Sequence, residues 1–430
     1  MKRGIIIGGG IAGLTAASYL CNSGFFIRLL ESSPKTGGRA FSFFDKNLNC
    51  NLDNGQHLLM GCYGYTLDFI RLIDAVGNFK VQTKMELNFI DANKKHFSLK
   101  ASSLPYPFSL LTAILGFKAV PLAERLSAIA FFAKLPLVTG NSIRAMSVRE
   151  WLKSMAQSDL IISVLWELLA VSALNADIDT ASASVFCDIL KQIFFHGNSS
   201  TRMIIPAKGL SQSFCEPAET FITAKGGEVS LSEKVIRLVV VNNKVTKVIT
   251  NKNEYSDFDF VVSSAPLYSL KSFLPGYSSC IDSIPELEYS SIFSAHIKIK
   301  NNTLTDDFYA LIASPLHWVF NHGSYLTVVI SNSDSLQNMS KAEMEILVKE
   351  EIEKYFGIEK ENLSDIKIIK EKRATFIPSQ SVIKQRPGFT TNLDNFYLAG
   401  DWTSTGLPST IESAAKSGKI ISDYISGVLS

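Results

Sequence analysis

Three glycines near the N-terminus have the spacing of a phosphate-binding turn. Gly8, Gly10 and Gly13 fit the pattern G-x-G-x-x-G. In that pattern the first glycine allows a tight turn, the second lets backbone approach a diphosphate, and the third lets a helix pack on a strand. Ile11 and Ala12 would lie at the start of that helix, where free N–H groups and the positive dipole end attract phosphate. The pattern predicts a dinucleotide site.

The segments around this turn agree with the prediction. Gly4–Ile7 is an apolar run, typical of a strand buried on both faces of a parallel sheet. A second apolar strand, 25–30, ends at Glu31, where a carboxylate is the expected acceptor for ribose hydroxyls. Gly38 and Arg39 follow in a Gly-Gly-Arg turn. Such a turn also suits a protein surface, but here it can bring a guanidinium to a phosphate or a ring system.

A second group of residues with suitable chemistry lies near the C-terminus. An apolar strand is predicted at 395–399, and Asp401 at its carboxyl end could bind ribityl hydroxyls. The Ser-x-x-Glu pattern of Ser409–Glu412 predicts a capping box that opens a helix. The positive end of that helix would stabilise negative charge on the pyrimidine edge of a reduced flavin. The residues expected to hold the cofactor here are Gly400, Asp401, Ser409, Thr410 and Ile411.

A cofactor held at both ends by segments so far apart in the chain is predicted to be FAD. We expect further contacts to it from Gly55, Gln56, Val235 and Ala265. No second G-x-G-x-x-G pattern occurs, so an ordinary nicotinamide site is not expected. The sequence therefore leaves the electron donor of the flavin open.

The chain is predicted to leave the cofactor-binding sheet and return to it twice. Residues 1–85, 205–283 and 386–430 would form a discontinuous, Rossmann-like α/β FAD-binding domain. Residues 86–204, largely helical, and 284–385, rich in alternating strands, would form an inserted α+β substrate-binding domain. A site is then expected where the two domains meet.

Composition excludes several kinds of partner. A net charge of +2 without a basic run argues against a nucleic-acid partner. The 6 cysteines lack C-x-x-C pairing and the 6 histidines lack ligand spacing, so no structural metal is expected. The first strand begins so close to the N-terminus that a signal peptide is not expected, and a cytoplasmic location is predicted.

Apolar residues are concentrated between 104 and 137. The longest uncharged stretch, 101–117, is broken by Pro105 and Pro107 and does not predict a membrane span. Two interpretations remain open for this region. It could dip into lipid and hold the protein at the inner face of the cytoplasmic membrane, or its helices could cap an apolar substrate chamber.

Three further motifs, in order along the chain, resemble one enzyme family. Asp53–His57 with Gly61–Tyr63 is similar to the D-x-G-Q-H…G-x-Y stretch of squalene-associated FAD-dependent desaturases, the hydroxysqualene dehydroxylases. Leu165–Asn175 is similar to their LWEPLALAALN segment, with Leu168 in place of proline, and Pro206–Ser211 resembles their P-x-x-G-L-S motif. The whole chain resembles the wider amine oxidase and phytoene desaturase superfamily.

The resemblance implies FAD-dependent reduction of hydroxysqualene to squalene in hopanoid synthesis. Loss of water from an allylic alcohol leaves a delocalised carbocation, which a hydride from reduced flavin would quench inside an apolar chamber that excludes water. The leaving hydroxyl needs a proton. His57 is the first candidate for the general acid, and Asp53 and Glu167 are the reserves. His57 could instead only hydrogen-bond backbone and shape the flavin pocket.

Three other functions remain open. A carotenoid desaturase or isomerase would use the same fold on a similar polyprenoid in the oxidising direction. Amine oxidation would need room for a polar amine, which the apolar insertion disfavours. A prenyl-binding escort protein, similar to Rab GDP-dissociation inhibitors, would need no redox chemistry, but the intact glycine pattern with Glu31 and Asp401 favours a bound flavin.

Overall fold

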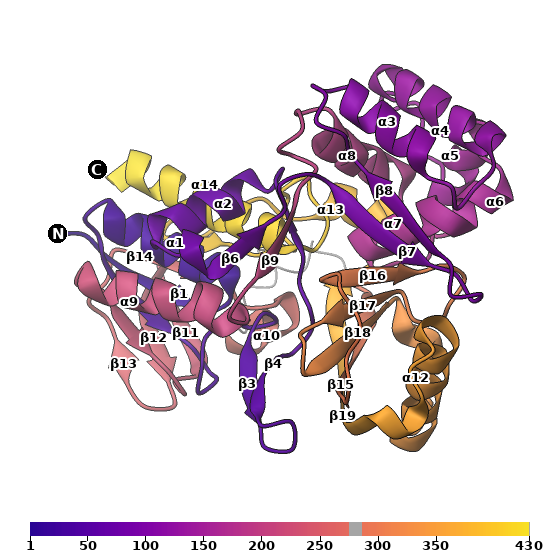
Figure 1. Cartoon of the computed structure of the whole chain (residues 1–430). Coiled ribbons are helices and arrows are strands. Elements are labelled where there is room, and N and C mark those ends of the chain that lie inside the picture. The colour runs from indigo at the N-terminus through magenta and orange to yellow at the C-terminus, as the bar shows by residue number, and fades with distance from the viewer. Residues whose placement is uncertain (275–285, 430) are drawn as a thin grey trace.

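A parallel five-stranded sheet carries the glycine turn. The computed structural model describes residues 1–274 and 286–429 (Figure 1). The strand order is β10 (Glu228–Ser230), β2 (Phe26–Leu30), β1 (Arg3–Ile7), β14 (Phe260–Ser263) and β20 (Phe396–Leu398), with all neighbours parallel. β1 is central because it is apolar on both sides: Ile6 packs into the core on one face, and Ile5 and Ile7 pack on the other.

Helices cover one face of this sheet, and a small antiparallel sheet covers the other. The helices are α1 (Ile11–Asn22), α9 (Glu216–Ala224) and α14 (Ile411–Leu429), and the strands are β11 (Val235–Val241), β12 (Lys244–Thr250) and β13 (Glu254–Tyr255). α1 and α14 approach closely at Gly418, where a Cβ would lie 2.5 Å from the carbonyl oxygen of Ala12. This contact joins the two ends of the chain, whose termini lie on the same side of the molecule (Figure 1).

A mixed seven-stranded sheet forms the second half of the molecule. Its order is β19 (Leu363–Phe376), β15 (Tyr289–Ile299), β18 (Tyr325–Ser331), β17 (Trp318–Asn321), β16 (Phe308–Leu311), β7 (Glu86–Ile90) and β8 (His96–Lys100). The pairing is antiparallel except between β7 and β16. α12 (Lys341–Phe356) covers one face through Met344, Val348 and Ile352.

Helices pack on the opposite face of this sheet. They are α3 (Phe108–Gly116), α4 (Leu122–Lys134), α5 (Val148–Ser154), α6 (Asp159–Ile161), α7 (Glu167–Leu174) and α8 (Ala183–Phe194). Trp151, Trp166 and Phe186 share one core with Phe308 and Trp318 of the sheet. The segment 86–204 is therefore not helical from its start, since the β7–β8 hairpin belongs to the sheet. Alternating burial along Glu86–Ile90 reflects this strand pairing.

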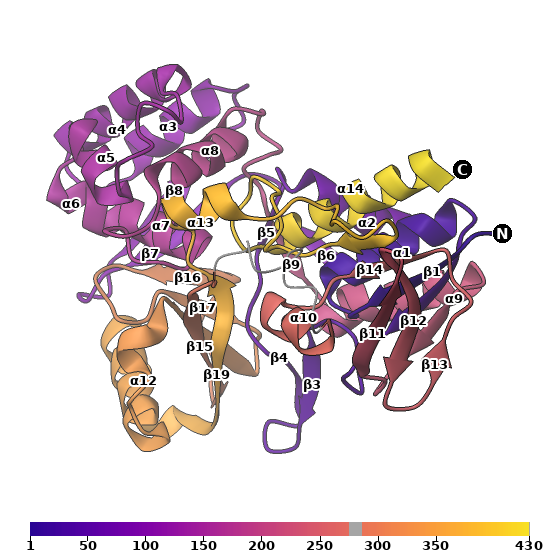
Figure 2. The ribbon, with the colours of Figure 1, turned by 180° about the vertical axis from the view of Figure 1, so that it is seen from behind.

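Short elements connect the two halves. They are the hairpin β3 (Ser42–Asp45) and β4 (Cys50–Asp53), the small sheet of β5 (Leu59–Met60), β9 (Met203–Pro206) and β6 (Phe79–Val81), and the helices α2 (Gly64–Leu72), α10 (Leu267–Phe273) and α13 (Gln380–Gln385). Viewed from behind, β4, β5 and α13 lie between the two halves (Figure 2). Within residues 1–274 and 286–429, none of the helices has the length and hydrophobicity to cross a bilayer.

Candidate flavin and substrate site

A cavity of about 840 Å³ lies between the parallel sheet and the seven-stranded sheet. The sequence-predicted cofactor residues that line it are Gly8, Gly10, Ile11, Ala12, Glu31, Gly38, Arg39, Gly55, Gln56, Val235, Ala265, Gly400, Asp401, Ser409, Thr410 and Ile411. They come from both ends and the middle of the chain. Gly13 does not line the cavity, because it lies beneath the turn.

The glycine turn leaves room for a ligand. Gly8 has φ +103°, a conformation that disfavours side chains, and a Cβ on Gly13 would lie 2.0 Å from the carbonyl oxygen of Gly8. Around Gly10, in contrast, a Cβ would meet no atom within 4 Å. Gly10 is also the N-cap of α1 and provides no side-chain cap, so the helix presents unpaired N–H groups to this space. These features fit the diphosphate of a dinucleotide.

Glu31 connects the turn to the end of β2. One carboxylate oxygen accepts a hydrogen bond from the Gly9 backbone N–H at 2.6 Å, and the other accepts one from the Ser33 N–H at 2.7 Å. The residue is buried yet lines the cavity. Oε1 also accepts from the Ser32 hydroxyl at 3.1 Å, whereas Oε2, among the described residues, accepts only from Gly9 and keeps a further lone pair, so the site fits a nucleotide ribose.

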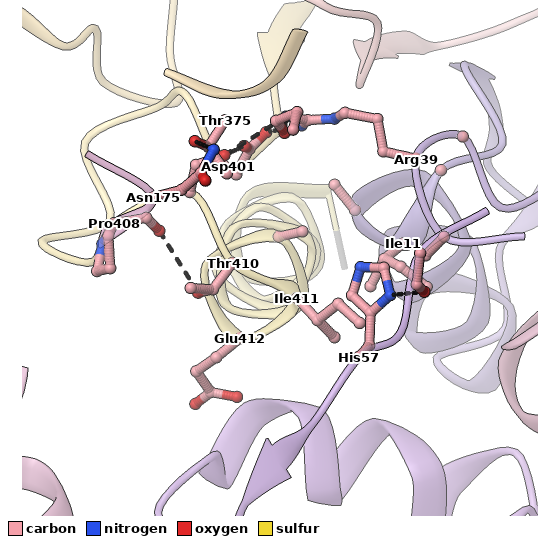
Figure 3. Close-up of a pocket in the computed structure, with 18 of the residues that line it drawn as sticks. Ile11, Arg39, His57, Asn175, Thr375, Asp401, Pro408, Thr410, Ile411 and Glu412 are labelled. Atoms are coloured by element: carbon pink, nitrogen blue, oxygen red, sulfur yellow. Dashed lines mark hydrogen bonds and ion pairs between the residues drawn. The ribbon is translucent and has the colours of Figure 1, made fainter. Parts of the chain in front are cut away.

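Arg39 and Asp401 form a charge pair across the cavity wall. The Arg39 Nη2 lies 2.5 Å from Asp401 Oδ1 (Figure 3). The Ser409 hydroxyl donates to the other carboxylate oxygen. Burial alone would raise the pKa of Asp401, but Arg39 and these hydrogen bonds outweigh it and hold the pKa below its usual value. Asp401 is therefore anionic at neutral pH.

The predicted capping box is wrong. The Ser409 hydroxyl is used by Asp401, and Thr410 Oγ1 instead accepts from the Ser413 N–H at 3.1 Å. Glu412 accepts from the backbone N–H groups of Tyr65 and Thr66 at 3.0 and 2.8 Å. These amides lie in the first turn of α2, which has no side-chain cap of its own. Glu412 thus caps a neighbouring helix, a tertiary pairing that a local pattern does not encode.

Arg386 supports the site from behind its lining, a role that the sequence did not indicate. Its buried guanidinium donates to the carbonyl oxygens of Leu407 at 2.6 Å and of Asp401 at 2.8 Å, and also to that of Thr403. It therefore fixes the loop between β20 and α14. Burial lowers the pKa of Arg386 to about 10, which leaves it charged at neutral pH. A single arginine in a loop gives no signal of such a role.

Of the three candidate proton donors, the structure brings only His57 to the cavity. Asp53 turns away from it and accepts from Ser42 Oγ at 2.6 Å and from the Leu210 N–H at 2.8 Å. Glu167 lies 3.8 Å from Arg149, and its side chain is 42% exposed at the surface. Neither carboxylate can reach a ligand in the cavity from these positions.

His57 carries its proton on a defined ring nitrogen. Its Nδ1 lies 2.8 Å from the carbonyl oxygen of Gly55, and since a carbonyl only accepts, Nδ1 is the donor. Burial lowers the pKa of His57. The ring is then neutral at physiological pH, with an unprotonated Nε2, and it faces the same space as Ile11 and Ile411 (Figure 3).

The cavity continues away from the glycine turn into an apolar arm, which passes between α7, α8 and the seven-stranded sheet. The apolar residues of the arm are Met85, Leu87, Leu169, Phe186, Ile189, Leu190, Ile193, Phe194, Met203, Ile292, Trp318, Phe320 and Val329. No residue of 104–137 lines it. That region instead contributes Leu110, Phe117 and Phe131 to the neighbouring core.

The sequence profile described as flavin containing amine oxidoreductase matches residues 11–426. The chain belongs to this family. It is therefore a flavoprotein oxidoreductase, and its fold agrees with the predicted Rossmann-like α/β arrangement with an inserted α+β part.

Among its relatives, the hydroxysqualene dehydroxylase of Zymomonas mobilis is 26% identical over 427 residues, covering 97% of each protein. That of Rhodopseudomonas palustris is 29% identical over 426 residues, covering 98% of this chain and 97% of the relative. The crystal structure of an oxidoreductase from Methanosarcina mazei superimposes with a TM-score of 0.79 at 16% identity, covering 98% of this chain and 100% of that one. The predicted family resemblance is thus confirmed.

Replacing Gly10 by valine tests the cofactor part of the cavity. The side chain would enter open space, so the fold should keep its unfolding midpoint while the purified protein loses most of its flavin absorption. Gly77→Val is the matched control, since a Cβ there also meets no atom within 4 Å but lies outside the cavity. Normal flavin content in Gly10→Val would contradict the assignment of the turn.

Proposed function

We propose that this flavoprotein is an FAD-dependent hydroxysqualene dehydroxylase. In this reaction hydroxysqualene and reduced FAD give squalene, water and oxidised FAD. The names of the relatives and the three motifs in their order support this choice. When bound, reduced FAD supplies the two electrons and two hydrogens that the exchange requires.

One observation carries the proposal: the glycine turn and the apolar arm line the same cavity. A polyprenoid chain bound in the arm would reach the proposed flavin site at one end, because the arm opens there into the rest of the cavity. The walls of the arm are aliphatic and aromatic side chains from α7, α8 and the sheet, so they offer a carbocation few nucleophiles and exclude water. A hydroxyl group is lost in such a chamber without being replaced by solvent.

In the proposed site each end of FAD has its own residues. The N–H groups at Gly10 would bind the diphosphate and Glu31 the ribose. Asp401 and the N-terminus of α14 would hold the flavin end. We propose that residues 1–85, 205–283 and 386–430 serve as the FAD-binding domain and that 86–204 and 284–385 serve as the substrate domain.

Of the two roles that the sequence left open for His57, we favour the one in which it bonds to backbone and shapes the flavin pocket. Because burial lowers its pKa, the imidazolium form is scarce at neutral pH, and a general acid role is disfavoured. The proton on its Nδ1 is donated in a hydrogen bond to the Gly55 carbonyl oxygen. We propose that neutral His57 shapes the wall near the flavin and offers Nε2 as a hydrogen-bond acceptor.

We also propose that the outer faces of α3 and α4 rest on an anionic lipid bilayer. Exposed apolar residues lie on these helices and in the segments next to them, namely Leu104, Phe108, Leu115, Leu122, Leu126 and Leu137. The charged residues within 104–144 are mostly cationic: Lys118, Arg125, Lys134 and Arg144 against Glu124. Tyr106 packs on Phe195 with ring centroids 6.1 Å apart, next to Phe194 of the apolar arm. The surface therefore lies near the end of the arm, where a lipid-soluble substrate would enter.

Anaerobic turnover tests the function. Holoprotein reduced chemically and mixed with hydroxysqualene should form squalene, identified by mass, with one flavin oxidised for each squalene. The same protein with oxidised FAD and phytoene should form no desaturated product. Formation of product only in the second mixture would overturn the proposal in favour of a desaturase.

The pH dependence of turnover tests the place of His57. If its imidazolium were the proton donor, turnover would fall about tenfold for each pH unit above a pKa that lies below the ordinary value. We expect instead a change of less than about threefold between roughly pH 7 and 8.5. His57→Asn, which can still donate to the Gly55 carbonyl oxygen, should keep its flavin and the flat profile. A steep decline of wild-type turnover with rising pH that is absent in His57→Asn would show that His57 is the general acid.

Flotation with vesicles tests the lipid contact. Wild-type protein should float with phosphatidylglycerol vesicles and much less with neutral ones, because cations flank the apolar surface. A triple variant, Phe108→Ser, Leu122→Ser and Leu126→Ser, should remain at the bottom of the gradient. Ile346→Ser with Val428→Ser removes equally exposed apolar side chains elsewhere and should still float. Flotation of the triple variant like wild type would exclude this surface.

A further inference from the structure

A bulge in β19 turns part of that strand toward the cavity. Ser290 of β15 pairs with Thr375 and Ile292 pairs with Glu371, so residues 372–374 stand opposite Ser291 alone. Bulges of this kind redirect side chains and backbone groups from a regular sheet. As a result Thr375 lines the cavity, and the carbonyl oxygen before it, that of Ala374, accepts from Arg39 Nη1 at 2.8 Å. Thr375 is thereby placed beside the flavin side of the cavity.

Asn175 holds the Thr375 hydroxyl by a hydrogen bond from the end of α7. It ends α7 in a left-handed conformation with φ +48°, and it is buried at 3% exposure. Its Oδ1 accepts from the Asn332 backbone N–H at 2.6 Å. Its Nδ2 donates to Thr375 Oγ1 at 2.9 Å (Figure 3). Because the Asn332 N–H can only donate, Oδ1 must face it, which leaves Nδ2 for Thr375. The direction of this relay is therefore fixed.

These two hydrogen bonds leave the hydroxyl proton of Thr375 without an acceptor. Thr375 Oγ1 accepts from Asn175, so its own hydrogen is free to donate, and none of residues 1–274 and 286–429 accepts it. A buried hydroxyl proton without a protein acceptor gains most by donating to a polar ligand atom. The hydroxyl of Ser172 in α7, which also lines the cavity, differs. Ser172 donates to the Leu168 carbonyl oxygen and accepts from Trp318 Nε1, so its proton is already used.

We infer that Thr375 donates a hydrogen bond to the hydroxyl oxygen of the substrate, with Asn175 as the positioning residue. The inference rests on the proposed function, since it identifies where the alcohol group of hydroxysqualene lies. The bond draws electron density toward the departing oxygen and keeps the carbinol carbon on the flavin side of the chamber. Squalene has no oxygen to accept this hydrogen bond, so Thr375 would also make the substrate bind more tightly than the product.

Binding measured by the change in flavin absorption of oxidised holoprotein tests the inference. Thr375→Val has the same shape without the hydroxyl. It should weaken the affinity for hydroxysqualene about tenfold, the usual size of a hydrogen bond lost in a dry site, and leave the affinity for squalene unchanged. Thr375→Ser, which keeps the hydroxyl, should bind hydroxysqualene almost as tightly as wild type. Equal weakening for both ligands would reveal a packing role and overturn the inference.

A second variant reverses the relay. In Asn175→Asp the carboxylate still accepts from Asn332 but cannot donate, so Thr375 would turn its proton away from the ligand and toward the aspartate. Its affinity for hydroxysqualene, relative to that for squalene, should fall as much as in Thr375→Val. The double variant should lose no more of this affinity than either single variant. Additive losses would show that the two residues act separately, against the inference. Thr246→Val, an exposed threonine outside the cavity, serves as control.

The outcomes separate the inference from the function on which it rests. Wild type that reduces hydroxysqualene while Thr375→Val binds it normally overturns the role of Thr375 alone. Flavin-loaded wild type that binds neither ligand overturns both. Flavin content and the unfolding midpoint of each variant show whether a loss comes from a damaged fold.

Discussion

The guanidinium of Arg39 is the group on which the rest of the site depends. Its Nη2 pairs with Asp401 at the end of the parallel sheet, and its Nη1 donates to the Ala374 carbonyl oxygen in the bulge of the other sheet. Asp401 is only 6% exposed, so its charge requires a partner. Loss of one member of such a pair leaves an uncompensated buried charge. Arg39 therefore ties the end of the parallel sheet to the bulge of the seven-stranded sheet.

From this junction the cavity runs in two directions with opposite chemistry. Toward the glycine turn it offers unpaired helix N–H groups and carboxylates, which suit a nucleotide. Toward α7 and α8 it offers aliphatic and aromatic side chains with few polar atoms, which suit a polyprenoid. A reaction that removes a hydroxyl group and adds hydrogen needs both environments to meet, because the charged intermediate must form near the flavin and away from water.

Local sequence patterns predicted the elements that interact with near neighbours. The turn at Gly8–Gly13, the strands on either side of it and the acid at Glu31 lie within one short stretch, so their spacing carries the information. Pairings between distant segments could not be predicted. Glu412 caps a helix 346 residues earlier in the chain, and Asn175 meets Thr375 across 200 residues. Nothing at either partner alone indicates the other, and the sequence therefore misassigned Glu412 and missed Arg386 and Thr375.

A crystal structure of the FAD-loaded protein with squalene is the most direct test that one continuous cavity serves cofactor and substrate. The account predicts density for the diphosphate against Gly10 and for the hydrocarbon along Leu169, Phe186 and Ile193, with the two ligands in contact. Squalene bound in a separate pocket, or flavin bound away from the glycine turn, would contradict it.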